Sequence, residues 1–334
     1  MNRLSLKGIG ILSLLVSVIC SCAVEVEESS RSIQERVFNS YIAVHGYEGM
    51  ETIEDDIYVF KREGGEGKQY PEDSTFVMAN YVAKYISGEY AGYTSDTLAM
   101  LLGNYSPAKY YGDLCLEGGT DFLSNPLNDI IKTMRKGERV VAVVPPWLYT
   151  DYSGPVIASD GSIIEYDITV TELIEDIDTY QLAQLKEYSA KNYEGMDSLS
   201  KGFYFKKIYE VEGKEEGDTI VSGTSINIRY IGRFLDGRVF DTNIQDTAKK
   251  YGIFSTISEY TALSLLYDDD YEKIIEDASL VSGFSRAIAT DELYYGEKCI
   301  TFFYYEEGYG ADGNGDGIPP YCPLFFEIWI EDND

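Results

Sequence analysis

One tetrapeptide occurs twice in the chain, and it constrains the fold more than any other feature of the sequence. Tyr47-Glu48-Gly49-Met50 returns 146 positions later as Tyr193-Glu194-Gly195-Met196. A polar, helix-compatible stretch precedes each copy, at 31–44 and at 179–192. Because the segments that follow also match in kind and order, the identity indicates duplication. A period this long means two copies of one domain rather than a solenoid of short repeats.

Each copy continues with short segments typical of strands. Aromatic-rich segments lie at 57–61 and 203–207, and a Gly/Glu turn follows each. Alternating segments that end in tyrosine come next, at 76–81 and 225–230, where the offset has become 149. Later strand-like segments lie at 139–144, 163–170, 300–304 and 324–330, with helix-like segments at 128–134 and 283–292. The predicted fold class is α+β, with an antiparallel sheet wrapped on a short helix in each domain.

The length and composition agree with two domains. The chain has 334 residues, of which 44% are hydrophobic and 14% aromatic, enough for two cores. The acidic stretch 172–178 marks the boundary between the copies. We expect a signal peptide at 1–21, an acidic tether at 22–30, a degenerate domain at 31–176, a helical linker at 177–201 and a second domain at 202–334, with an inserted flap at about 244–278.

Charge and histidine content exclude several functions. The chain has 57 acidic and 27 basic residues, a net charge of −30, which repels phosphate backbones, so no nucleic-acid partner is expected. His45 is the one histidine, and no nucleophile motif lies near it. Catalysis by a serine–histidine or cysteine–histidine pair is therefore not predicted, nor is a metal site or a bound cofactor.

The N-terminus is typical of an exported protein. Arg3 and Lys7 precede an apolar run at 9–20, which is too short for a comfortable membrane span. The run ends in Cys20-Ser21-Cys22, which resembles the lipobox of bacterial lipoproteins, with Cys22 at the lipidated position. An ordinary secretory signal is the alternative. We expect a lipid-anchored, extracytoplasmic protein, held to the membrane through Cys22.

Three cysteines, Cys115, Cys299 and Cys322, remain beyond this region, so at least one thiol is expected to stay free. A disulfide between Cys299 and Cys322 is one open alternative. The run 312–317 matches the first half of a calcium loop, but Pro323 stands where that motif needs an acidic residue. A glycine-rich turn is therefore favoured over a calcium site.

The second copy contains a set of ordered motifs: Ile228-Arg229-Tyr230-Ile231-Gly232, Asp236-Gly237-Arg238-Val239-Phe240-Asp241, Leu280-Val281-Ser282-Gly283-Phe284, Gly296-Glu297-Lys298, Tyr309-Gly310-Ala311, Gly317-Ile318-Pro319-Pro320 and Leu324-Phe325-Phe326-Glu327-Ile328. In this order they resemble the FKBP family of peptidyl-prolyl isomerases over about 202–331. The resemblance implies two FKBP-like domains, of which the second is well matched.

The resemblance also implies a site. Its catalytic residues would be Tyr230, Phe240, Asp241 and Tyr309, and its substrate-binding residues Val281, Phe284, Ile318 and Phe326. Asp241 would anchor a tyrosine hydroxyl or contact the substrate, Tyr309 would bond a substrate carbonyl, and Ile318 would reach over the proline ring. Any one of these aromatic residues is equally compatible with a place in the core.

The chemistry implied needs neither a nucleophile nor a metal. The barrier to rotation about the peptide bond, about 18–20 kcal/mol, comes from lost amide resonance. The twisted amide is less polar than the planar one, so a dry aromatic pocket favours it differentially.

Two departures from the family pattern stand out. Phe284 occupies the place where the family usually has tryptophan, which gives a shallower pocket floor. Between Asp241 and Leu280 lie 38 residues, more than the family needs, and the excess at 255–277 is predicted to be helical. This flap is expected to bind a client or to cover the pocket; a surface excursion is the alternative.

The first copy has lost most of the motifs. Tyr90-Ala91-Gly92 stands near the place of Phe-Asp, Leu127 falls at the pocket floor, and no Gly-Ile-Pro-Pro loop appears. We predict that this copy is not an isomerase and that it serves in binding, spacing or dimerisation.

The leading hypothesis is a peptidyl-prolyl cis–trans isomerase, a folding factor for exported polypeptides that contain proline. The alternative is a non-catalytic, client-binding or chaperone lipoprotein on the same scaffold. A glycan-binding lipoprotein is a third hypothesis, for which only Trp147 and Trp329 are available.

Overall fold

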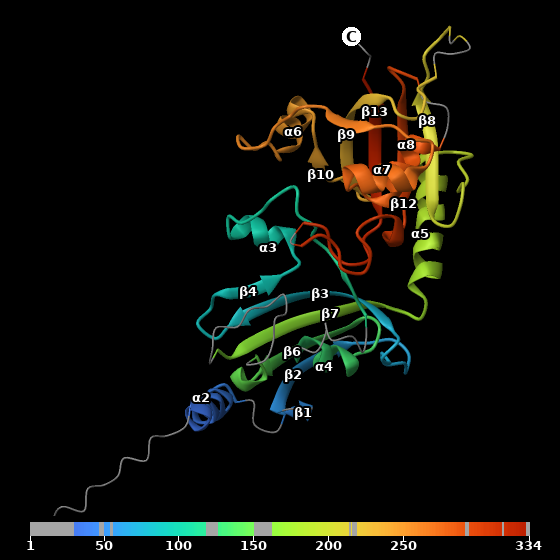
Figure 1. Cartoon of the computed structure of the whole chain (residues 1–334). Coiled ribbons are helices and arrows are strands. Elements are labelled where there is room, and N and C mark those ends of the chain that lie inside the picture. Colours follow the sequence, from blue (N-terminus) through green and yellow to red (C-terminus); the bar gives the residue numbers. More distant parts are fainter. Residues whose placement is uncertain are drawn as a thin grey trace, which may run out of the picture. The chain divides into compact units, whose positions relative to one another are not determined.

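The structure is a computed structural model that describes residues 30–46, 50–53, 56–117, 126–149, 162–213, 215, 219–290, 294–315 and 317–331 (Figure 1). The chain divides into two compact units, Met1–Gly46 and Tyr47–Asp334. In the first unit, helix α2 spans Ser30–Val44, and the ring of His45 is hydrogen-bonded to the carbonyl of Tyr41. The expected signal peptide and Cys22 lie outside the described residues.

The second unit contains two lobes, which we call the first lobe (50–174) and the second lobe (203–331). The first lobe is built from β1 (Glu51–Ile53), β2 (Ile57–Gly64), β3 (Phe76–Tyr85), β4 (Tyr90–Tyr93), α3 (Asp96–Leu101), β5 (Leu114–Glu117), α4 (Pro126–Lys132), β6 (Glu138–Val144), η3 (Pro146–Tyr149) and β7 (Ile164–Ile174). Helix α5 (Ile177–Asn192) follows. The second lobe is built from β8 (Phe203–Tyr209), β9 (Ser225–Phe234), β10 (Val239–Thr242), α6 (Gln245–Tyr251), β11 (Leu263–Leu266), α7 (Tyr271–Ala278), α8 (Ser282–Ala289), β12 (Lys298–Phe303), η4 (Tyr305–Glu307) and β13 (Leu324–Ile330).

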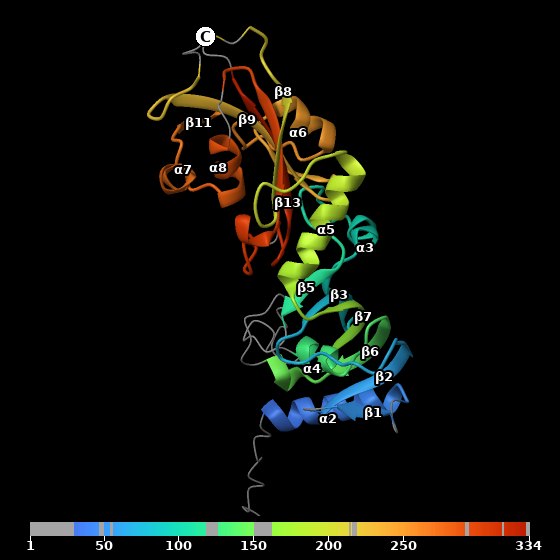
Figure 2. The ribbon, with the colours of Figure 1, turned by 90° about the vertical axis from the view of Figure 1, so that its right-hand side faces the viewer.

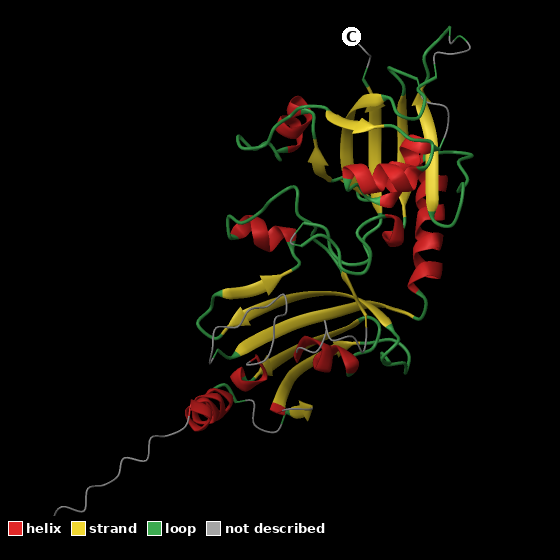
Figure 3. Ribbon diagram, viewed as in Figure 1, coloured by secondary structure: helices red, strands yellow, loops and turns green. Residues whose placement is uncertain are grey.

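The two sheets have the same strand order. Both lobes combine helices with an antiparallel sheet, which confirms the predicted α+β class (Figure 3). In the first lobe the order is β2-β6-β7-β3-β4, with β5 on β3 and β1 added outside β2. In the second lobe it is β8-β12-β13-β9-β10, with β11 on β9. All of these pairs are antiparallel. The second lobe thus repeats the strand order of the first, as the duplicated sequence predicts, while β1 and α7 have no counterparts among the described elements.

The repeat extends into the segment after β4 and β10. Twenty residues separate β4 from β5, and twenty separate β10 from β11. The amide of Ser106 donates to the Tyr111 hydroxyl (3.2 Å), and 149 positions later the amide of Ser255 donates to the Tyr260 hydroxyl (2.9 Å). The part of the flap between β10 and β11 therefore has a counterpart of equal length in the first copy, whereas the segment from β11 to α8 is longer than the segment from β5 to α4.

The predicted helix over 255–277 is confirmed only from 271 onward, in α7; residues 255–262 and 267–270 are not helical, and 263–266 form a strand. There β11 pairs with β9, and the helices lie on either side of it, as α6 and α7. Along β11, Leu265 is buried whereas Ser264 and Leu266 are exposed. This is the period of two that a strand requires, hidden in the sequence because an exposed leucine follows a buried one.

Both faces of the second sheet are covered. Phe303 and Phe326 pack with α8 on one face, and Phe302 and Phe325 pack with Leu185 of α5 on the other. Successive residues of a strand point to opposite faces, so paired phenylalanines in β12 and β13 serve both layers. Figure 2 shows α5 alongside this sheet. Helix α5 is thus part of the second lobe's packing.

Within the described ranges, no helix is both long enough and apolar enough to cross a membrane. Cys115, Cys299 and Cys322 are buried free thiols, so the alternative of a disulfide between Cys299 and Cys322 is not realised.

A buried ion pair recurs at the same place in both sheets. Glu138 is 0% exposed and accepts from Arg62 (2.9 Å), and in the second lobe Glu297, 2% exposed, lies 3.0 Å from the Lys207 ammonium. Burial acts to raise the pKa of the Glu138 carboxyl, but hydrogen bonds from Arg62 and Arg135 outweigh it and hold the pKa below its usual value.

We expect Glu138→Gln to lower the free energy of unfolding by about 2 kcal/mol, because it removes the buried carboxylate that accepts from Arg62 and Arg135. A carboxyl with a lowered pKa stabilises the fold above its usual range, and this stability is lost as pH falls through the lowered pKa. Urea unfolding at several pH values should therefore show the two proteins converging in acid. The matched control is Glu63→Gln, whose carboxyl is 55% exposed beside Lys61, with an expected change below about 1 kcal/mol. Equal effects from both variants would contradict the prediction.

Candidate active site

The structure brings the eight predicted site residues together in the second lobe. They come from β9 (Tyr230), β10 (Phe240, Asp241), the start of α8 (Val281, Phe284), the loop after η4 (Tyr309, Ile318) and β13 (Phe326). Phe284, Ile318 and Phe326 are buried in the core cluster, and the other apolar members pack against it half-buried. Asp241 is exposed at its edge.

Four aromatic rings form the wall and floor of the site. Phe326 lies at their centre, with its ring centroid 5.1 Å from Phe284, 5.7 Å from Phe240 and 6.4 Å from Tyr230. Phe284 and Tyr230 also meet edge to face, at 5.7 Å. Edge-to-face contacts of this kind fix the rings relative to one another. Phe284 is 3% exposed, so phenylalanine provides a closed floor in the place of tryptophan.

A β-bulge sets the directions of Phe240 and Asp241 in β10. Val239 pairs with Arg233 and Asp241 with Gly232, so Phe240 is the extra residue. The bulge places Phe240 on the ring cluster and Asp241 beside Tyr230, whose hydroxyl donates to the Asp241 carboxylate at 2.7 Å. The anchoring of a tyrosine hydroxyl, one of the two roles expected for Asp241, is the one seen here.

Two glycines make room for the rings. A Cβ on Gly232 would lie 2.7 Å from the ring of Phe240, and one on Gly283 would lie 2.2 Å from the ring of Phe303. Real Cβ atoms do not approach this closely, so any larger residue would push the rings apart. The sequence motifs contain both glycines, but nothing in the sequence alone shows which ring each one admits.

Charged groups hold the floor helix in place. Glu307 in η4 accepts from the guanidinium of Arg286 and from the hydroxyl of Ser282 (2.5 Å), both on α8. Arg286 also donates to Ser200 (2.7 Å) and lies over the ring of Phe203. Glu307 is therefore a structural ion-pair partner that joins α8 to the turn before Tyr309.

The loop from Tyr309 to Ile318 closes on itself. The amide of Gly313 donates to the Tyr309 carbonyl (3.1 Å), and the amide of Asn314 donates to the Ile318 carbonyl (2.7 Å). Gly313 has φ +67°, and a Cβ there would lie 2.4 Å from the Ile318 carbonyl oxygen. The stretch weighed as half a calcium loop thus includes a tight turn that presents Ile318, although Asp316 lies outside the described residues.

The tyrosine hydroxyls of the site stay protonated. Burial raises the pKa of Tyr230 well above its usual value, and the neighbouring charge of Asp241 raises it further. Burial and Asp241 also raise the pKa of Tyr309. Both phenols are therefore hydrogen-bond donors throughout the neutral range.

Among its described residues, the first lobe differs from the second at the positions of the site. Strand register puts Ala91 at the bulge position of Phe240, Gly92 at Asp241 and Tyr166 at Phe326. Tyr166 is 1% exposed, and Leu127 is buried in the same core. The first lobe retains the scaffold without the phenylalanine and aspartate that define the site in the second.

Sequence comparison identifies the second lobe. Residues 217–331 match the family described as FKBP-type peptidyl-prolyl cis-trans isomerase. Over this range the second lobe is similar to FKBP-type domains, and we call it the FKBP-type domain.

Two curated relatives each match about a third of the chain. FK506-binding protein 59 of Drosophila melanogaster is 27% identical over 111 residues, which are 33% of this chain and 20% of that protein. FK506-binding protein 3 of Dictyostelium discoideum is 26% identical over 119 residues, which are 36% of this chain and 50% of that protein. The chain thus spans half or less of the length of these relatives.

Solved structures similar to this chain include the three FKBP domains of wheat FKBP73, with 17% identity, a TM-score of 0.29 and coverage of 84% of this chain and 98% of that one. FkpA from Escherichia coli is 22% identical, with a TM-score of 0.31 and coverage of 46% of this chain and 60% of that one.

We expect Gly232→Ala to lower the free energy of unfolding of the FKBP-type domain by about 1–3 kcal/mol, because the new Cβ collides with Phe240. Urea unfolding measures the loss, and near-ultraviolet circular dichroism reports the displaced rings. Gly317→Ala is the matched control, since its Cβ would have no neighbour nearer than 3.9 Å, and it should change stability by less than about 0.5 kcal/mol. A fully stable Gly232→Ala protein with an unchanged aromatic spectrum would show that the rings are not confined as described.

Proposed function

We propose that the FKBP-type domain catalyses cis–trans isomerisation of Xaa-Pro bonds in exported polypeptides. The observation that carries this proposal is the hydrogen bond from Tyr230 to Asp241, formed at the edge of the cluster of Phe240, Phe284 and Phe326. It places a fixed polar group beside an apolar floor, the arrangement that a proline ring with flanking carbonyls requires.

The pocket acts on the barrier through its polarity. Rotation about the C–N bond removes amide resonance, and the barrier of about 18–20 kcal/mol reflects that loss. The planar amide is the more polar state, so transfer to an apolar pocket disfavours it relative to the twisted state. Phe284 and Phe326, 3% and 5% exposed, supply that environment.

The remaining residues orient the substrate. Tyr309 offers a protonated hydroxyl to a substrate carbonyl, and Ile318 covers the proline ring. Val281 lies at the start of α8, beside the floor, and lines the substrate's path. Asp241 fixes the Tyr230 ring through its hydroxyl. No bound cofactor or metal takes part in this mechanism.

The first lobe is proposed to be inactive as an isomerase. Ala91 and Gly92 provide neither the ring nor the carboxylate at the bulge, so the site has no apolar wall and no anchor for a tyrosine hydroxyl.

An extracytoplasmic location follows from the N-terminal sequence. The apolar run that ends at Cys22 supports export and lipidation, with the membrane as partner through the acyl chains. The clients proposed are exported polypeptides that contain proline.

Isomerisation of a Xaa-Pro peptide tests the activity. We expect the full chain to accelerate it, and Asp241→Ala and Tyr309→Phe each to lower kcat/KM by about tenfold, the effect of one hydrogen bond of about 1.4 kcal/mol in the transition state. Asp246→Ala and Tyr90→Phe are matched controls, because the Asp246 carboxyl is 95% exposed and Tyr90 is an exposed residue of the first lobe.

The outcomes separate the two functions. Activity that falls in the site variants and not in the controls supports the isomerase. A folded protein that does not accelerate isomerisation would overturn it. If that protein still binds unfolded polypeptides, the non-catalytic client-binding function takes its place.

A further inference from the structure

A loop of the first lobe contacts the loop that presents Ile318. We call residues 104–113, between α3 and β5, the brace loop, and residues 309–323 the pocket loop. The backbone amide of Tyr110 in the brace loop donates to the carbonyl of Gly317 in the pocket loop at 3.1 Å. The ring of Tyr110 lies edge to face with Phe234, 5.3 Å between centroids, and packs on the core of the FKBP-type domain.

An arginine from the hairpin between β9 and β10 also binds the brace loop. Arg238 donates to the carbonyl of Tyr111 at 2.8 Å and is held by Asp236 at 2.7 Å. Its guanidinium lies over the rings of Tyr110 and Phe234, both at 5.5 Å. A half-buried guanidinium that stacks on rings and donates to carbonyls gives a directional contact, which a lysine would not reproduce.

Both contacts lead directly to the site. Gly317 precedes Ile318 in the chain, so the hydrogen bond from Tyr110 fixes the peptide unit that carries Ile318. Phe234 lies 5.2 Å from Phe240, the ring at the bulge. The far end of the pocket loop is held as well, because the Gln181 amide donates to the Tyr321 carbonyl at 2.6 Å.

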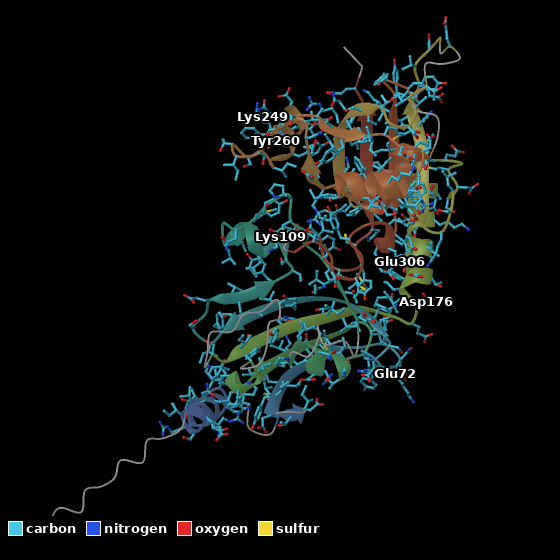
Figure 4. All side chains as sticks on the ribbon, in the orientation of Figure 1. Glu72, Lys109, Asp176, Lys249, Tyr260 and Glu306 are labelled. Carbon is cyan, nitrogen blue, oxygen red and sulfur yellow. The ribbon has the colours of Figure 1, made fainter. Side chains whose placement is uncertain are left out.

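The duplicated loop in the second lobe provides an internal comparison. It has the same internal hydrogen bond and stacked ring pair, with Phe254 on Tyr260 in place of Tyr105 on Tyr111. Position 149 after Tyr110 is Glu259, which is exposed. The Tyr260 carbonyl, the counterpart of the acceptor used by Arg238, accepts instead from Arg229 of its own lobe at 3.0 Å. Figure 4 labels Lys109 and Tyr260, one on each copy of this loop.

We propose that the brace loop is a positioning element of the isomerase site, through which the first lobe fixes the pocket loop and the Phe240 wall. Tyr110 and Arg238 are positioning residues, since each acts through Ile318 or Phe240. The inference rests on the proposed isomerase function and deepens it: the copy that has lost its own pocket residues supplies part of the frame of the other copy's pocket.

The test compares kcat/KM for a Xaa-Pro peptide in the full chain and its variants. We expect Tyr110→Ala and Arg238→Ala each to lower kcat/KM about tenfold, since small displacements of positioned groups have effects of this size or larger. The double variant should fall little further, because the two residues serve one contact. Tyr110→Phe keeps the ring and should retain activity. Glu259→Ala, at the equivalent position of the second lobe, is the matched control and should equal wild type.

Amide hydrogen exchange of peptides from 309–323 gives a readout independent of activity. In Tyr110→Ala this exchange should accelerate at least fivefold, while exchange in β12 and β13 stays as in wild type, which separates a released loop from a destabilised fold. Unchanged exchange would overturn the proposal whether or not the protein is an isomerase. Faster exchange with unchanged kcat/KM would also overturn it. If the wild type lacks activity, the proposed function fails, and with it the positioning role, while the exchange result decides whether the brace exists.

Discussion

The packing of Phe326 is the interaction on which the second lobe and its site both depend. This residue lies on the face of β13 that meets α8, stacked 5.9 Å from Phe303 of the neighbouring strand. The same ring is the centre of the site cluster, in contact with Phe240 and Phe284. The cluster of site residues is therefore an extension of the hydrophobic core that reaches the surface at the bulge. Its geometry is set by the same close packing that stabilises the fold, which is why two glycines, Gly232 and Gly283, are needed to admit the rings.

Duplication explains why one scaffold serves two purposes in this chain. Both lobes keep the strand order, the bulge and a buried glutamate, which is Glu138 at the start of β6 and Glu297 just before β12. These features therefore belong to the fold. What differs is a small set of side chains at matched positions: Phe240 and Asp241 in the second lobe correspond to Ala91 and Gly92 in the first. The first lobe forms its sheet with Ala91 and Gly92 at the positions of Phe240 and Asp241, so the scaffold does not need those two side chains, whereas Tyr166, the counterpart of Phe326, stays buried in the core. Divergence of one copy is thus compatible with a stable fold, and it frees that copy's loops for other contacts.

The sequence predicted the parts of the structure that depend on local pattern. The repeat, the α+β class and the proximity of the eight proposed site residues all followed from motifs whose order and spacing are present in the printed sequence. The helix predicted over 255–277 failed at 263–266 because Leu265 and Leu266 stand side by side, and only pairing with β9 shows which of them is buried. The steady offset of 149 from Tyr81 to Leu116 was present in the sequence as matched alanine, glycine, serine and tyrosine positions. It would have shown that the part of the flap up to β11 is duplicated. The ring that each glycine admits is a property of tertiary packing and has no local signal.

The contact of Tyr110 with Gly317 could not be predicted from the sequence, since it joins residues more than 200 positions apart through a backbone amide and a carbonyl. Any residue except proline can make that hydrogen bond, so composition carries no trace of it. Its specificity comes from the groups around it: the Tyr110 ring on Phe234, and Arg238 between the rings and the carbonyls. The counterpart loop keeps its internal architecture but has Glu259 in place of the tyrosine, and a guanidinium from its own lobe occupies the matching carbonyl. The two loops thus have the same internal contacts and differ in the group that donates to the matched carbonyl. The Tyr111 carbonyl accepts from Arg238 of the other lobe, and the Tyr260 carbonyl accepts from Arg229 of its own lobe. The brace loop of the first lobe packs against the second lobe through the half-buried Tyr110. Its copy in the second lobe is exposed after α6, where Ile257 is 92% accessible.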